Sequence, residues 1–255
     1  MAMHPEGRTV ALVTGAAQGI GRATALRLSA DGMLVVVNDR KPSEELDRIV
    51  EECGGIPAIA DVSDPHAVEE MVSRIEAEAG PVGVLVSNAA YMAMGPFLEQ
   101  SEDEWWAQIR TNLCGTFHLI RFVLPGMRRL GRGKIVIVSS EWGVTGWPNA
   151  TAYAASKGGL ISLGKTLGRE LAPEGIFVNV VAPGVTDTPQ LECDARDAGI
   201  PIEEMRERYA AESPIRRIGK PEEIAATISF LASSRSDPFV GQVLQPNGGT
   251  TRCWA

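Results

Sequence analysis

The chain has 255 residues, 44% of them hydrophobic and 22% charged, with a formal net charge of -8. A chain of this size can bury a core without disulfides or metals, so we expect one soluble domain over residues 1–255. The acidic balance and the absence of a Lys/Arg cluster argue against a nucleic-acid partner. No apolar run suits a membrane span or a signal peptide, which predicts a cytoplasmic protein without a membrane partner.

The cysteines and histidines show no metal-ligand spacing. Cys53, Cys114, Cys193 and Cys253 lie far apart, and only three histidines occur. This pattern predicts free thiols in a reducing compartment and no metal site.

Short apolar runs alternate with amphipathic stretches along the chain. Strands are expected at 9–13, 33–37, 56–60, 82–86, 134–138, 177–181 and 243–245. Helices are expected at 20–30, 43–53, 65–79, 101–129 (in two parts), 151–171 and 221–233. Continuously apolar strands are typical of burial on both faces, and the regular alternation with helices predicts parallel pairing. We therefore expect an α/β fold, a single Rossmann-type doubly wound parallel sheet of about seven strands with helices on both faces.

Residues 186–214 interrupt this alternation. The segment is charged, contains Gly199 and Pro201, and has a helical stretch at 203–212. A long excursion after the carboxyl end of a strand is typical of a lid over a ligand site. The alternative is a solvated surface decoration.

Three glycines directly follow the first expected strand, in Thr14-Gly15-Ala16-Ala17-Gln18-Gly19-Ile20-Gly21. A strand, a tight turn and a helix start suit a pyrophosphate, which the free N–H groups and the helix dipole attract. Gly15 allows the turn, Gly19 lets the backbone approach the phosphates, and Gly21 lets the helix close on the sheet.

The second expected strand ends at Asn38-Asp39-Arg40. An acid here accepts hydrogen bonds from the adenosine ribose and repels the 2′-phosphate of NADP, so Asp39 predicts NAD. Arg40 leaves the alternative open, because a neighbouring Arg can hold that phosphate.

A second group of motifs carries a family resemblance. Ser140 is followed thirteen residues on by Tyr153 and four more by Lys157, in Tyr-Ala-Ala-Ser-Lys. With the TGxxxGxG pattern of the glycine loop, they make the chain resemble the short-chain dehydrogenase/reductase family over essentially its whole length. Further matches are Asn112 in Thr-Asn-Leu, Pro183-Gly184, the run 217–223 and Gly248-Gly249.

These residue types suit proton transfer coupled to hydride transfer. Tyr153 and Lys157 share one helix face, and the lysine ammonium and the positive nicotinamide would lower the tyrosine pKa from about 10. Ser140 would hold the substrate oxygen and steady a developing alkoxide. The resemblance implies that Lys157 also binds the nicotinamide ribose and that Asn112 holds a water in a proton relay.

The resemblance also implies cofactor and substrate contacts. Besides the glycine loop with Gln18 and Ile20, it places Asp61, Val62, Asn88, Ala89, Pro183, Gly184, Val185 and Thr188 at the cofactor. The chain departs from the family pattern at Ser87, Ala90 and Asn247. Trp142, Trp147, Met92 and Leu191 are expected to line the substrate, with core or subunit-interface packing as the alternative. Glu141 would face a polar or cationic group of the substrate, or only solvent.

The favoured function is an NAD(H)-dependent oxidoreductase that interconverts a secondary alcohol and a ketone, on a largely apolar or cyclic substrate. One alternative is an NADP(H)-dependent 3-oxoacyl thioester reductase. Another is a non-catalytic dinucleotide-binding sensor. The resemblance implies a homotetramer in which the long helices after Ser101 and Thr151 pair across subunits.

Overall fold

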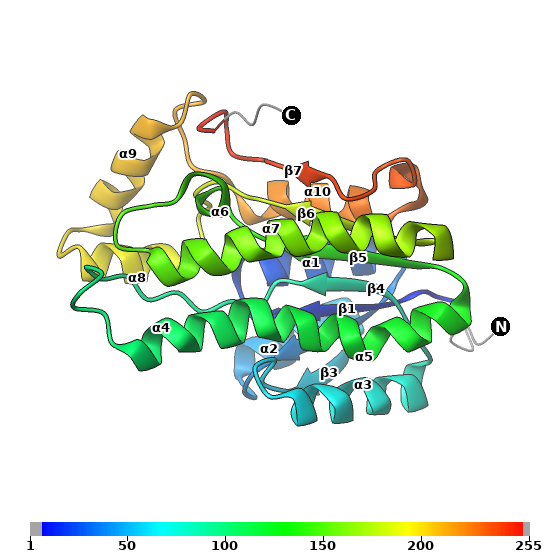
Figure 1. Ribbon diagram of the computed structural model, residues 1–255. Coiled ribbons are helices and arrows are strands. Elements are labelled where there is room, and N and C mark those ends of the chain that lie inside the picture. The colour runs from blue at the N-terminus through cyan, green and yellow to red at the C-terminus, as the bar shows by residue number, and fades with distance from the viewer. Residues whose placement is uncertain (1–6, 252–255) are drawn as a thin grey trace.

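The computed structural model describes residues 7–251, so His4 and Cys253 lie outside the described residues. Seven strands form one parallel sheet in the order β3-β2-β1-β4-β5-β6-β7 (Figure 1), which confirms the predicted fold class. The strands are β1 (Val10–Thr14), β2 (Leu34–Asp39), β3 (Ile56–Ile59), β4 (Val82–Ser87), β5 (Gly133–Val138), β6 (Ile176–Val181) and β7 (Val243–Leu244). No helix among the described residues is long and apolar enough to cross a bilayer.

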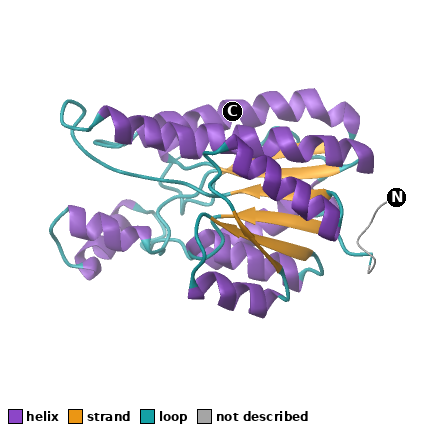
Figure 2. Cartoon of the chain, turned by 90° about the horizontal axis from the view of Figure 1, so that it is seen from below, coloured by secondary structure: helices purple, strands orange, loops and turns teal. Residues whose placement is uncertain are grey.

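Helices cover both faces of the sheet (Figure 2). On one face, α1 (Gly19–Ala30), α2 (Glu44–Cys53) and α10 (Pro221–Ala232) bury Leu28, Ile49 and Ile228 against the strands. On the other, α3 (Pro65–Ala79), α5 (Gly115–Leu130) and α7 (Thr151–Leu171) bury Met71, Leu119 and their neighbours in a second cluster. Burial on both faces explains the uninterrupted apolar strands.

Side-chain caps begin two of these helices. Ser43 Oγ accepts the Leu46 N–H at 3.1 Å and begins α2. An Asp64 carboxylate oxygen accepts the His66 N–H at 2.9 Å and begins α3, with Pro65 in the first turn. Each cap satisfies an N–H group that the helix leaves without a partner.

The expected helix at 101–129 divides at a π-helical turn, η1 (Arg110–Cys114), which separates α4 (Glu102–Ile109) from α5. Asn112 in this turn is buried and bonded to residues of other elements. Because tertiary bonds set the turn, the local helical pattern does not reveal it.

Short elements complete the chain. The segment after β6 forms α8 (Gln190–Asp197) and α9 (Ile202–Glu212), of which the sequence predicts only the second, and α6 (Trp142–Thr145) follows β5. Short 3₁₀ turns lie at Ala172–Glu174 and Ser234–Ser236.

The sheet order fixes where a ligand can bind. β1 lies between β2 and β4, so the chain leaves β1 toward one edge of the sheet and later returns from β3 to β4 on the other side of β1. In doubly wound sheets such a switch point opens a crevice at the carboxyl ends of the strands. In Figure 1, α8 and α9 lie beyond this same edge.

Candidate active site

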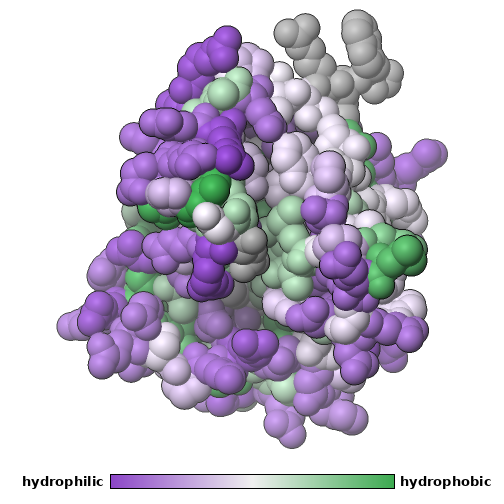
Figure 3. Space-filling view, turned by 90° about the vertical axis from the view of Figure 1, so that its left-hand side faces the viewer, coloured by the Kyte–Doolittle hydropathy of each residue, from purple (hydrophilic) through white to green (hydrophobic). Residues whose placement is uncertain are grey.

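A cavity of about 420 Å³ opens at the carboxyl ends of the strands. Figure 3 faces this edge and shows a hollow among hydrophilic side chains. Most of the predicted site residues line the cavity: Gly15, Gln18, Gly19, Ile20, Asp39, Arg40, Asp61, Val62, Asn88, Ala89, Met92, Ser140, Trp142, Tyr153, Lys157, Pro183, Gly184, Val185, Thr188 and Leu191. Asn112, Gly21 and Trp147 are not in its lining.

The glycine loop has the backbone that its sequence demands. Gly15 and Gly19 have φ values of 62° and 55°, a region that residues with a Cβ rarely adopt. A Cβ on Gly21 would lie 2.1 Å from the Gly15 carbonyl oxygen, so this position tolerates no side chain. The loop therefore keeps α1 close to β1 and leaves N–H groups at the cavity, as a pyrophosphate requires.

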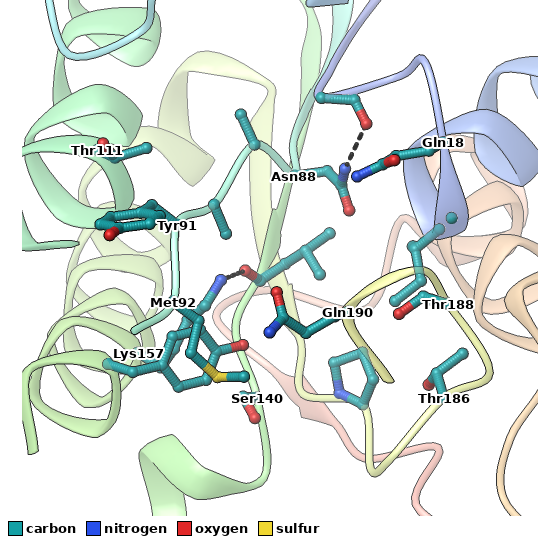
Figure 4. A pocket seen from close by; sticks show the side chains of 18 of the residues that line it. Gln18, Asn88, Tyr91, Met92, Thr111, Ser140, Lys157, Thr186, Thr188 and Gln190 are labelled. Carbon is teal, nitrogen blue, oxygen red and sulfur yellow. Dashed lines mark hydrogen bonds between the residues drawn. The ribbon is translucent and has the colours of Figure 1, made fainter. Parts of the chain in front are cut away.

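Asn88 supports this loop from β4. Its Nδ2 donates to the carbonyl oxygens of Thr14 at 2.9 Å and Gly15 at 3.2 Å (Figure 4). Thr14 Oγ1 in turn accepts the N–H groups of Asn88 at 3.0 Å and Ala89 at 3.1 Å. The side chain of Asn88 thus positions the phosphate loop besides lining the cavity. Ala90, a departure from the family pattern, also lines the cavity.

Asp39 stands at the end of β2, at the rim of the cavity. Its carboxylate accepts the Ala17 N–H at 3.2 Å, which ties it to the glycine loop, and the N–H of its neighbour Arg40 at 2.7 Å. Arg40 is exposed and also lines the cavity. Asp39, which predicts NAD, and Arg40, which leaves NADP open, therefore lie side by side.

Ser140, Tyr153 and Lys157 come together at the inner end of the cavity. Ser140 follows β5, and its hydroxyl lies near enough to the Tyr153 hydroxyl to lower the pKa of that tyrosine. Lys157 is 2% exposed, and its Nζ lies 5.4 Å from the centroid of the Tyr153 ring. Nζ donates to the Val138 carbonyl oxygen at 2.9 Å, a bond that Figure 4 shows. One end of α7 and one end of β5 thus build the site.

Burial is the main influence on the pKa values of Tyr153 and Lys157 in the protein itself. Burial raises the pKa of Tyr153 to about 12, although the Ser140 hydroxyl opposes this rise. Burial also lowers the pKa of Lys157 to about 8. Desolvation is the largest influence on the Tyr153 hydroxyl in the protein itself. The predicted activation also counts the positive charge of a bound nicotinamide, so it stays a prediction.

Asn112 acts on the site from behind the cavity wall. Its Oδ1 accepts the Tyr91 N–H at 2.8 Å, and its Nδ2 donates to the Tyr91 carbonyl and the Ser156 hydroxyl, both at 3.0 Å. Its carbonyl oxygen accepts the Thr116 hydroxyl at 2.8 Å. The side chain is thus engaged in binding protein groups, and its neighbour Thr111 lines the cavity in its place.

The expected substrate residues divide between two cavities. Met92 and Leu191 line the first, and Trp142 lines both. Trp147 lines only the second, where its ring stacks on Trp142 with centroids 4.9 Å apart. Glu141 is 4% exposed, so the prediction that it only faces solvent is wrong. The fold of the loop after β5 turns it inward.

Several lining residues have no role in the prediction from the sequence. Tyr91, Thr111, Thr186 and Gln190 line the cavity, and in Figure 4 Gln190 and Met92 point into the same space. Gln190 Nε2 donates to Asp194 Oδ1 at 3.0 Å, so it is held within α8. Gln190 directly precedes the expected lid residue Leu191, and this position could have predicted that Gln190 lines the cavity.

The residues fit a dinucleotide better than a metal. The glycine loop, Asp39 and the Ser-Tyr-Lys group form one continuous lining, and no cluster of three or more metal-binding side chains occurs within residues 7–251. A phosphate loop joined to a proton-transfer group defines a dinucleotide-dependent oxidoreductase.

The comparisons with known proteins agree with this class. A family profile described as enoyl-(acyl carrier protein) reductase matches residues 15–251. The 3-oxoacyl-(acyl-carrier-protein) reductase FabG of Thermotoga maritima is 40% identical over 252 residues, 97% of this chain and 99% of the relative. An acetoacetyl-CoA reductase of Rhizobium meliloti is 36% identical over 241 residues, 94% of this chain and 97% of the relative. The chain belongs to the short-chain dehydrogenase/reductase family.

Two solved structures share the fold closely. An actinorhodin polyketide ketoreductase variant with NADPH has a TM-score of 0.91 and 34% identity, over 97% of this chain and 99% of that one. A protein described as a ribose-5-phosphate isomerase of Brucella melitensis has a TM-score of 0.90 and 32% identity, over 95% of this chain and 92% of that one. Because the two descriptions differ, the activity must be argued from the site.

Proposed function

We propose that the protein interconverts a ketone and a secondary alcohol by hydride transfer with a nicotinamide dinucleotide. The observation that carries this proposal is the meeting of Ser140, Tyr153 and Lys157 in the cavity that the glycine loop also lines. A substrate oxygen at Ser140 and Tyr153 would lie beside the position that the loop gives to the cofactor.

The bound nicotinamide supplies the hydride and, when oxidised, a positive charge. Ser140 Oγ orients the substrate oxygen and stabilises negative charge on it. Tyr153 Oη donates its proton to that oxygen in reduction and removes it in oxidation. The Val138 carbonyl oxygen holds the Lys157 ammonium group near the tyrosine ring. Its positive charge favours the phenolate as the proton leaves.

Asp39 supports NAD(H) as the cofactor. Its carboxylate lines the cavity at the end of β2, where a 2′-phosphate would meet its negative charge. The ketoreductase neighbour with NADPH supports NADP(H) instead, and Arg40 offers that phosphate a cation. NAD(H) remains our prediction from the residues, and the comparisons favour the alternative.

A second candidate concerns the substrate. Relatives described as 3-oxoacyl and acetoacetyl-CoA reductases favour a 3-oxoacyl thioester ketone. A general apolar or cyclic ketone is supported by Met92, Leu191 and Trp142 in the cavity lining. Both candidates share the same proton and hydride transfers.

We also propose that residues 186–214 act as the lid of a single domain over residues 1–255, and that the protein assembles as a cytoplasmic homotetramer. Thr188 and Gln190 at the start of the segment line the cavity, which supports the lid. Exposed Trp106 on α4 and Phe117 on α5 support association through these helices.

The test follows the ultraviolet absorbance of reduced nicotinamide with each dinucleotide and a panel of ketones that includes cyclic and 3-oxoacyl types. Turnover should disappear in Tyr153→Phe, while dinucleotide binding measured by calorimetry persists. Tyr91→Phe is the matched control, because Tyr91 also lines the cavity but lies outside the Ser-Tyr-Lys group. Unchanged turnover in Tyr153→Phe overturns the mechanism. Dinucleotide binding with no turnover on any ketone favours the sensor alternative.

A further inference from the structure

A second cavity, of about 180 Å³, lies next to the first. Glu141, Trp142 and Val185 line both cavities. The remaining wall comes from Trp147, the end of α9 and the segment that follows it, the start of α10, and the chain after β7. A water molecule takes about 30 Å³ in the liquid, so the space is larger than one water molecule needs.

Aromatic rings form one side of this second cavity. Trp142 and Trp147 are stacked with their planes 5° apart, and Tyr209 lies with its ring centroid 6.4 Å from that of Trp147. Trp142 also meets the Tyr153 ring edge-on at 6.0 Å, which links this side to the catalytic tyrosine. Aromatic faces carry partial negative charge and attract organic cations.

Carboxylates form the other side. Glu141 and Glu212 line the cavity, and they are near enough for Glu212 to raise the Glu141 pKa. Arg217 is the only basic side chain among the described residues of the lining, and Glu223 binds it with two hydrogen bonds, at 2.6 Å and 2.8 Å. The net charge that faces the cavity is therefore negative.

Glu141 is buried with part of its hydrogen-bonding capacity unused. The Val185 N–H and the side chains of Asn247 and Thr251 lie near its carboxylate and lower its pKa. The Oε2 atom of Glu141 has no partner. Burial and Glu212 together raise the pKa of Glu141 to about 7. A buried, unpaired carboxylate oxygen is costly unless a donor or a cation meets it.

We propose that the second cavity binds a protonated amine, so that the substrate is an amino ketone or its amino alcohol. A nitrogen there would place an N–H near Glu141, offset the repulsion from Glu212, and face the aromatic pair. The carbonyl end would remain at Ser140, the residue directly before Glu141. This inference rests on the proposed hydride transfer and adds to it the charge of the substrate.

The first experiment compares matched alcohols. The substrates are methyl carbinols that each carry a protonated amine at the end of the chain. One, two or three methylene groups separate the carbinol from the nitrogen. Each is paired with the alcohol in which methyl replaces the ammonium. For at least one spacer length, kcat/KM for the amine should exceed that of its uncharged partner by about tenfold or more, the effect of one good charged contact. Equal kcat/KM values at every length overturn the proposal.

Variants locate the effect. Glu141→Gln and, independently, the surface change Glu212→Gln should each lower the amine-to-methyl ratio of kcat/KM severalfold. Glu207→Gln removes an exposed carboxylate from the same helix, α9, outside either cavity lining, and should leave the ratio unchanged. If the amine-to-methyl ratio of kcat/KM is unchanged in both Glu141→Gln and Glu212→Gln, the amine binds elsewhere and the assignment is wrong.

A binding measurement separates this proposal from the proposed function. Calorimetric titration with propylammonium should show binding to wild type that Glu141→Gln weakens, whereas propanol should not compete. Amine binding without oxidation of any alcohol would support the cation site and reject the proposed hydride transfer. Oxidation of the uncharged alcohols, with neither amine preference nor propylammonium binding, would reject the cation site and support the hydride transfer.

Discussion

Lys157 Nζ donates a hydrogen bond of 2.9 Å to the carbonyl oxygen of Val138, the last residue of β5. The bond anchors the charged end of a buried side chain to the sheet beside the catalytic serine. It also consumes one of the three donors of the ammonium group and leaves two for other partners.

Replacing Lys157 by Met should therefore abolish most activity without unfolding the protein. Methionine fills a similar buried space, and removing a buried charge together with its polar contact is tolerated when the replacement packs well. We expect turnover to fall by about 100-fold or more, in line with loss of proton-transfer assistance. Steady-state kinetics and a thermal melt check both parts. Lys165→Met, an exposed change on α7, is the control, and an active Lys157→Met variant would contradict the mechanism.

Asp39 should decide the cofactor. Asp39→Ser removes the carboxylate that repels a 2′-phosphate, so the ratio of kcat/KM for NADPH over NADH should rise by about tenfold or more. Arg40→Ala should move the same ratio in the opposite direction. A wild-type enzyme that already prefers NADPH would show that Arg40 outweighs Asp39.

Glu141 should give the protein a characteristic dependence of stability on pH. Its pKa in the folded protein, about 7, lies above the ordinary value of 4.5, so the folded state holds this proton more tightly than the unfolded chain. As pH rises from about 4.5 to about 7, the unfolded chain loses the proton first, and the free energy of unfolding decreases. Above pH 7 both states are ionised and the penalty stays constant.

Urea unfolding of wild type and Glu141→Gln at several pH values tests this dependence. The variant lacks the titration, so its stability relative to wild type should rise between about pH 4.5 and 7 and then level off. A constant difference across this range would mean that Glu141 titrates normally.

Association should depend on the apolar side chains near α4 and α5. Phe97, Leu98, Trp106 and Phe117 are 68%, 93%, 47% and 49% exposed. Large apolar side chains that gather on one surface are typical of protein–protein contacts. We expect light scattering to show a tetramer for wild type and lighter species for Trp106→Glu and Phe117→Glu. Ile59→Glu, at the far end of the sheet, should leave the mass unchanged. A monomeric wild type would refute the assembly.

Features coded by adjacent residues were predictable from the sequence. The strands appear as unbroken apolar runs because both faces are covered. The loop from Gly15 to Gly21 is local, and its backbone follows from glycine alone. Tyr153 and Lys157 lie one helical turn apart, so their common face needs no tertiary information.

Features that depend on distant segments were not predictable. Glu141 is buried because Val185 and Asn247, from two later parts of the chain, surround it. The π-helical turn at Asn112 depends on bonds to Tyr91 and Ser156. The raised pKa of Tyr153 reflects desolvation, which a sequence pattern does not measure.

The pairing of β1 with β4 also bears on how the protein reaches its native state. Val10 pairs with Val82 at the centre of the sheet, so a long stretch of chain must be gathered before the two strands meet. Such non-local pairing slows folding. The phosphate loop is complete only after this step, because Asn88 follows β4 and holds the loop that follows β1. Dinucleotide added to a refolding mixture should therefore raise the final yield of native protein while leaving the rate of sheet assembly unchanged.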